Sequence, residues 1–404
     1  MTPWREIWRD PRLLFAVYAL LAIIASVDNF HREIDVIEGH NVTHYNNYVI
    51  FRNAGEHLAE GQDLYQFWPQ EQWDLYKYSP TFAAAMWPLT QIPDVVGLII
   101  WNVAGALLLL CALRSLPLSS ASSAGAAWIV AKDLLTNLQN SQSNALVAAA
   151  MIFTCVYWER KRLAAAATAL AWSFYIKIFG VAVLLLWMLY PHKVKSAALM
   201  VGIGVGFAII PLLLTSPDLL TQQYQSWWNM LRGDHAASLG MSVMGLLTAW
   251  FGITGHKTIT VVIGGLILLS PLLRRSQFKS LRFRLGMLAS VLMWVVLFNH
   301  KAESPTFVIA TAGVAVWFAS RPVTRANIAL VVLTVLLSGF SSSDLAPDWL
   351  QRSLLEPYQF KVLPSLLVWL KLQGELWLTT DIPAVGSVIE DLQLRPVELL
   401  SRAA

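Results

Sequence analysis

The sequence predicts an all-α polytopic membrane protein, and three observations support this fold class. Hydrophobic residues make up 56% of the 404 residues and charged residues 13%, whereas soluble domains carry about 25% charged residues. Long apolar runs recur along the chain, which is typical of membrane helices of about 20 residues each. Lysine and arginine gather on alternate connections between these runs, and this bias orients helices in a membrane.

The apolar runs predict a bundle of roughly 10–13 transmembrane helices. The first run, residues 13–27, follows three arginines and is either a cleavable signal sequence or a retained first helix. The many runs behind it favour the retained helix. Residues 121–138 and the last run, which contains Pro364, are short or interrupted, and this leaves re-entrant or interfacial segments open. The later runs begin near Val95, Ala124, Ala145, Ala164, Val181, Ala197, Thr258, Met287, Phe307, Ala326 and Val362.

The connections between the runs divide into a basic set and a polar set. The basic set and the N-terminus are predicted to face the cytoplasm. The polar set, which includes an outer loop at residues 28–80, is predicted to face the opposite side. We therefore expect one membrane domain over residues 1–380 and a cytoplasmic tail at residues 381–404. The basic set is Arg114, residues 159–162, 192–195 and 274–284, Arg321 and Arg325, and the polar set is residues 28–80, 216–256, 299–305 and 341–361.

Charge and cysteine content exclude two classes of function. The formal net charge of +4 is explained by basic cytoplasmic loops, and no nucleic-acid-binding signature accompanies it, so we expect no nucleic-acid partner. Cys111 and Cys155 both lie inside apolar runs, which argues against a disulfide framework or a metal cluster.

The outer loop at residues 28–80 is too long to be a simple turn, and long polar loops often carry function. It holds four of the eight histidines and a dense set of aromatic residues. Residues 54–58 are predicted to form a short helix that ends at Gly61. Tyr65 and Tyr78 suit either an aromatic belt at the membrane surface or a surface that stacks on sugars.

Lys177 interrupts the apolar stretch 164–190, where a charge costs about 2.5 to 3.5 kcal/mol. Its ammonium either snorkels to the membrane surface or neutralises a lipid phosphate between helices. Gln142 and Asn144 lie at an outer helix end, where they either cap the backbone or bind a hydroxyl-rich ligand.

A second candidate cluster lies in the short outer connection between two strongly apolar runs. His300, Lys301 and Glu303 occupy this connection. Because a tight loop needs no titratable side chains in order to turn, we interpret these three residues as part of a site.

Four motifs in a fixed order carry a family resemblance. Residues 48–65 end in Gly-x-Asp-Leu-Tyr, residues 76–80 read Tyr-Lys-Tyr-Ser-Pro, residues 141–144 read Ser-Gln-Ser-Asn, and Lys177 lies between two isoleucines. In these motifs the chain resembles the bacterial membrane glycosyltransferases of the GT-C superfamily, and the resemblance covers most of its length. It is most similar to the polyprenyl-phosphate-mannose-dependent α-mannosyltransferases, catalogued as glycosyltransferase family 87.

Four positions depart from the family pattern, and one of them is the outer histidine pair, which is reduced to His300 followed by Lys301. Asn47 stands where the family commonly carries an acidic residue, Ser141 replaces a glycine, and Gly180 stands where a proline often follows the lysine. Because an amide cannot act as a general base, either another carboxylate takes over that role or the protein belongs to a divergent branch with a different substrate.

The resemblance implies a GT-C-like bundle in the bacterial cytoplasmic membrane, with its active site on the periplasmic side. It implies transfer of a mannose-like hexose from a polyprenyl-phosphate sugar to a lipid-linked or glycan acceptor, by a single displacement that inverts the anomeric centre. Membrane lipids are the remaining expected partner. The scheme requires no cofactor, because the lipid-linked sugar is a substrate, and it leaves a divalent metal open.

The roles implied for single residues follow the same scheme. Asp63 or Glu303 would supply the base, with His300 beside them in the catalytic set. Lys177, assisted by Lys77 or Lys301, would bind the donor phosphate. The groups expected to hold the sugar or the acceptor are Asn47, Tyr65, Tyr78, Gln142 and Asn144.

Two other functions stay open at this point. A lipid-linked-sugar flippase or transporter would also have many spans, although such proteins usually show charged or broken helices at mid-membrane in two related halves. A scaffold that keeps the fold without catalysis is favoured by Asn47.

Overall fold

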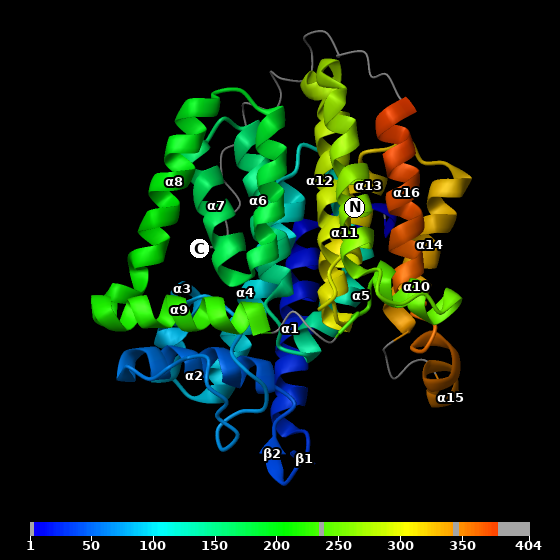
Figure 1. The fold of residues 1–404 in the computed structure, drawn as a ribbon. Coiled ribbons are helices and arrows are strands. Elements are labelled where there is room, and N and C mark those ends of the chain that lie inside the picture. Colours follow the sequence, from blue (N-terminus) through cyan, green and yellow to red (C-terminus); the bar gives the residue numbers. More distant parts are fainter. Residues whose placement is uncertain (1–3, 234–237, 342–346, 379–404) are drawn as a thin grey trace.

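The computed structural model describes residues 4–233, 238–341 and 347–378, which fold as a bundle of helices (Figure 1). Twelve helices of this described part correspond in order to the predicted apolar runs. Their order and starting points match the apolar runs, so the predicted all-α polytopic fold is confirmed. They are α1 (Pro11–His31), α4 (Asp94–Ser115), α5 (Ser120–Gln139), α6 (Asn144–Glu159), α7 (Leu163–Ile176), the 3₁₀ helix η3 (Ile178–Leu189), α8 (Lys193–Ile209), α11 (Lys257–Leu269), α12 (Leu281–Leu297), α13 (Phe307–Ala319), α14 (Arg325–Phe340) and α16 (Val362–Leu378).

The surface and length of these helices suit a membrane. Among the described residues, three stretches (α1, α4 and Lys193–Leu213) are long and apolar enough to cross one, and six shorter apolar helices accompany them. Large apolar side chains point outward, such as Val201 on α8, which is 67% exposed, and Leu266 on α11, which is 62% exposed. Exposed apolar surface of this kind marks contact with lipid or a partner. Although η3 has only 12 residues, a 3₁₀ helix rises about 2.0 Å per residue and so extends about 24 Å.

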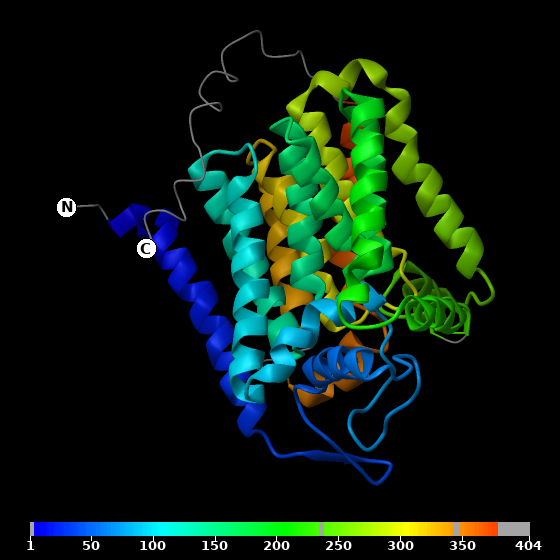
Figure 2. The same cartoon turned by 90° about the vertical axis from the view of Figure 1, so that its left-hand side faces the viewer.

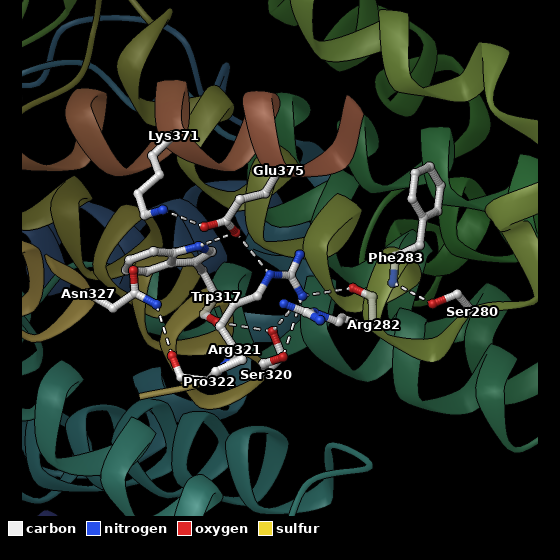
Figure 3. A network of polar contacts seen from close by, with 10 residues as sticks. All are labelled: Ser280, Arg282, Phe283, Trp317, Ser320, Arg321, Pro322, Asn327, Lys371 and Glu375. Carbon is white, nitrogen blue, oxygen red and sulfur yellow. Dashed lines mark hydrogen bonds and ion pairs between the residues drawn. The ribbon is translucent and has the colours of Figure 1, made fainter. Parts of the chain in front are cut away.

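One end of the bundle, which we call the basic end, collects the basic connections. Arg284 binds Glu159 through both carboxylate oxygens, at 2.6 and 2.8 Å, and Arg321 donates to the carbonyl of Arg282. Figure 3 shows how Arg321 also binds Glu375 of α16 at 3.0 Å. These contacts join α6, α12, α13 and α16 and place the connections 159–162, 274–284 and 320–325 at the same end.

The opposite end, which we call the loop end, carries the elements that lie outside the bundle. A two-stranded antiparallel sheet projects from the loop end, and the helices α2 and α9 lie across this end of the bundle (Figures 1 and 2). A buried amide clamps α9 to the 61–65 turn, since Gln223 donates to the carbonyl of Gln62 at 2.7 Å and accepts from the N–H of Leu64. The elements are β1 (Asp35–Ile37), β2 (His40–Val42), α2 (Asn46–Glu60), α3 (Pro80–Met86), η2 (Trp87–Gln91), α9 (Pro217–Gly233), α10 (Val243–Phe251), η7 (Ser304–Thr306) and α15 (Asp348–Leu350).

Local details refine the sequence predictions. The short helix expected at residues 54–58 is the longer α2, and it ends as predicted at Gly61, whose φ of 75° is left-handed. The run at residues 121–138 is the uninterrupted helix α5, and Pro364 lies in the first turn of α16, where proline is tolerated. The predicted cytoplasmic tail, residues 381–404, lies outside the described residues.

Candidate active site

The loop between α5 and α6 presents the predicted amides. Ser141 has a φ of 50°, the left-handed conformation that favours glycine, which explains why a glycine suits this position. The indole N–H of Trp101 donates to the Ser141 carbonyl at 2.9 Å, and Asn137 donates to the Gln142 carbonyl at 2.9 Å. These bonds hold Gln142 and Asn144 at the start of α6.

Lys177 lies at the sharp turn between α7 and η3 and points toward those amides. Its ammonium donates to Asn144 Oδ1 at 2.7 Å and lies 3.4 Å from Gln142 Oε1. It also lies 5.5 Å from the centre of the Tyr78 ring, within the range of a cation–π contact. The three sequence motifs that contain Lys177, Gln142 and Tyr78 therefore meet at one point.

The charge at Lys177 is set by burial and by two side chains from other segments. Burial lowers the pKa of Lys177 to about 8, the carboxylate of Glu303 opposes this shift, and the ammonium of Lys77 adds to it. Glu303 therefore acts electrostatically on the ammonium. Lys77 is partly exposed and forms an ion pair with Asp74 at 2.9 Å.

Tyr78 and Tyr65 form one wall of this region. The Tyr78 hydroxyl donates to Gln142 Oε1 at 3.3 Å, and the Tyr65 hydroxyl donates to the Tyr78 carbonyl at 2.8 Å. Ser79 caps α3 and binds the carbonyl of Tyr175 in the last turn of α7 at 2.5 Å. The 76–80 motif is thus fastened directly to the helix that presents Lys177.

Asn47 has a contact that the sequence did not predict. Its side-chain N–H donates to the carbonyl of Asn140 at 2.9 Å, at the C-terminal end of α5, where helix carbonyls lack intrahelical partners. A carboxylate could not donate this bond, so an amide at position 47 ties α2 to the loop that holds Gln142.

Asp63 lies on the far side of Tyr65, in a cavity between α9 and the loop after α2. One oxygen accepts from the backbone N–H of Tyr65 and the other from the hydroxyl of Ser226, both at 3.1 Å. The cavity has a volume of about 460 Å³ and is lined by Asp63, Tyr65, Leu75, Ser226, Asn229, Met230 and Gly233. Asp63 thus shares this cavity with Tyr65, whose hydroxyl binds the Tyr78 carbonyl.

The connection after α12 holds Glu303, whose carboxylate acts electrostatically on Lys177. Glu303 begins η7 in a capping box, in which its N–H donates to Thr306 Oγ1 at 3.2 Å and its carboxylate accepts from the Thr306 backbone. The carbonyl of His300 lies against Gly240, and the N–H of Lys301 bonds to Asn299.

The sequence analysis missed a buried ion pair beside this connection. Asp133 of α5 and Lys361, just before α16, lie 3.4 Å apart, and each side chain is 3% exposed. The signal in the sequence is Asp133 itself, because a carboxylate inside an apolar run requires a partner. In the described part of the chain, no group of three His, Cys, Asp or Glu side chains forms a candidate metal site.

Comparisons with known proteins bear on this geometry. Among solved structures, the chain is similar to the crystal structure of ArnT from Cupriavidus metallidurans bound to undecaprenyl phosphate, with a TM-score of 0.44 and 12% identity, over 90% of this chain and 77% of that one. No curated protein matches the sequence. The model of glycosyltransferase family 87 matches residues 76–342, a segment that contains Lys177 and Glu303 but not Asp63. Because this match covers more than half of the sequence, the chain belongs to glycosyltransferase family 87.

Proposed function

We propose that this protein is a membrane glycosyltransferase that transfers a mannose-like hexose from a polyprenyl-phosphate sugar to a lipid-linked or glycan acceptor. The observation that carries the proposal is Lys177, a buried cation held by Asn144 and Gln142 at the loop end, in a chain of a glycosyltransferase family. We place this end on the periplasmic side of the bacterial cytoplasmic membrane, because the basic connections gather at the other end.

The reaction is a single displacement at the anomeric carbon. An acceptor hydroxyl oxygen attacks this carbon while the bond to the phosphate oxygen breaks, and polyprenyl phosphate leaves with the bonding electron pair. Lys177 stabilises the negative charge that develops on the departing phosphate, and the low dielectric around it strengthens that interaction. Gln142 and Tyr78 supply the polar groups that orient the sugar beside it.

Glu303 is the carboxylate that we assign as the general base, which takes the proton of the acceptor hydroxyl. The choice rests on its electrostatic coupling to Lys177, because the base must reach the acceptor hydroxyl, which attacks the same anomeric carbon that the phosphate leaves. Asp63, already bonded to Tyr65 and Ser226, holds the acceptor in the neighbouring cavity.

The test is transfer from radiolabelled polyprenyl-phosphate sugars by the full-length protein in lipid nanodiscs and proteoliposomes. Lys177→Met keeps the length of the side chain and removes its charge, so we expect transfer to fall about 100- to 1,000-fold. Lys195→Met, at an exposed lysine of the basic end, is the matched control and should retain wild-type transfer.

Three results would contradict the proposal. Transfer by Lys177→Met within about threefold of wild type would remove the phosphate role. Movement of the donor across proteoliposomes without transfer by the wild type would identify a flippase. Neither transfer nor movement, with every donor tested, would favour a scaffold.

A further inference from the structure

The buried ion pair between Asp133 and Lys361 belongs to a cluster of polar side chains inside the bundle. Thr311 of α13 and Ser338 of α14 both donate to the Asp133 carboxylate, at 2.5 Å and 2.9 Å. The cluster therefore joins α5, α13, α14 and the start of α16. Because taking two charges out of water is costly, a buried pair of this kind is weak support for a role in stability alone.

Lys361 connects this cluster to the turn that contains Glu303. Its ammonium donates to the hydroxyl of Ser304 at 2.9 Å and lies 5.4 Å from the centre of the Phe307 ring. Ser304 directly follows Glu303, and the capping box between Glu303 and Thr306 closes the turn around it. A fixed Ser304 therefore limits where the Glu303 carboxylate can lie.

We propose that Lys361, held by Asp133, is a positioning residue that fixes Glu303 opposite Lys177 through the hydroxyl of Ser304. This inference rests on the proposed function, in which Glu303 is the base. A base held within a few tenths of an ångström of its productive position works far better than one on a mobile loop. The turn is short, and the N–H of Met241 also holds the carbonyl of Ala302 at 2.7 Å, so Lys361 adds a side-chain anchor next to Glu303 itself.

The cluster contains its own matched control. Ser304 and Ser338 are both hydroxyls bonded to the same ion pair, one to Lys361 and the other to Asp133. Ser304→Ala removes the hydrogen bond between Lys361 and the turn. Ser338→Ala removes hydrogen bonding of similar length to Asp133, which does not involve the turn. Ser304→Thr keeps the hydroxyl and serves as the conservative variant.

Two measurements on the full-length protein in nanodiscs test the proposal. In transfer assays we expect Ser304→Ala to lower kcat about 10-fold and leave the donor KM within about twofold, while Ser304→Thr recovers and Ser338→Ala keeps the wild-type kcat. In hydrogen–deuterium exchange, Ser304→Ala should speed exchange of the amides at residues 301–306 about 10-fold, because their turn loses its anchor. Ser338→Ala should leave that exchange unchanged.

The outcomes separate this inference from the proposed function. If Ser304→Ala and Ser338→Ala lose kcat to the same extent and thermal stability to the same extent, the cluster only stabilises the fold. That result would overturn the positioning role. Unchanged exchange at residues 301–306 in Ser304→Ala would overturn it as well, whether or not the protein transfers sugar. If the wild type is inactive but exchange responds as expected, the proposed function fails and the anchoring of the turn stands.

Discussion

Ser141 shows how one backbone angle determines which residue suits a position. Its φ of 50° is left-handed, a conformation that costs a residue with a Cβ about 1 kcal/mol more than glycine. Its hydroxyl adds little stabilisation, because its contact with Asn29 is long, at 3.5 Å. Asn29 already donates to the Gln139 carbonyl at 2.7 Å. Serine is therefore a strained residue at a position whose backbone conformation favours glycine.

We predict that Ser141→Gly stabilises the protein by about 0.5 to 1 kcal/mol, because it relieves this strain. Tryptophan fluorescence of the detergent-solubilised protein during heating should show a higher unfolding midpoint. Ser143→Gly is the control, since Ser143 has a right-handed φ of −81° at the start of α6, and glycine there should lower the midpoint. A lower midpoint for Ser141→Gly would show that the hydroxyl contributes more than the backbone strain costs.

The hairpin of α7 and η3 places Lys177 by bringing two helices unusually close. A Cβ on Gly180 would lie 2.3 Å from the carbonyl oxygen of Ser173, far inside contact distance, and Gly180 also donates its N–H to the Lys177 carbonyl at 2.8 Å. A proline would lose that bond as well. Glycine at position 180 is thus part of how this hairpin closes.

Gly180→Ala should therefore destabilise the protein by about 1 to 3 kcal/mol, because the backbone of one helix must move away from the other. The same shift moves Lys177, so sugar transfer should fall more than the amount of folded protein does. Gly202→Ala on α8, where a Cβ meets nothing within 4 Å, should be neutral or slightly stabilising. Size-exclusion profiles and transfer rates of the two variants give the comparison, and equal behaviour would refute the steric argument.

These elements also show how far the sequence could predict the structure. The apolar periods located every helix of the bundle, and Lys177 stood out because a charge in an apolar run is costly. The contact of Asn47 with Asn140 could not be predicted, because it depends on where α2 docks after the outer loop. Nor could the partners of Asp133, since Lys361 and Ser338 lie more than 200 residues away in the sequence. Local patterns determine elements, whereas the pairing of distant polar side chains depends on the packing of the bundle.

At the scale of the whole molecule, the basic connections lie at one end of the bundle and the candidate active site lies at the other. The connections at 159–162, 274–284 and 320–325 meet at the basic end through the pairs of Arg284 with Glu159 and of Arg321 with the Arg282 carbonyl. Lys177, Glu303 and the Asp63 cavity all lie at the loop end. If the basic end faces the cytoplasm, the proposed lipid-linked donor would reach Lys177 from the outer leaflet.

Single cysteines at the two ends test this orientation. Glu60 at the end of α2 and Lys195 in the first turn of α8 are both exposed, so Glu60→Cys and Lys195→Cys suit labelling in a background where Cys111 and Cys155 are replaced by serine and alanine. In intact spheroplasts a membrane-impermeant maleimide should label Glu60→Cys and should reach Lys195→Cys only after permeabilisation. The reverse pattern would put the site in the cytoplasm, where nucleotide sugars are available, and would remove the reason to require a lipid-linked donor. Labelling of both in intact spheroplasts would mean that the two ends are not separated by a bilayer at all, and the helices could not then be membrane spans.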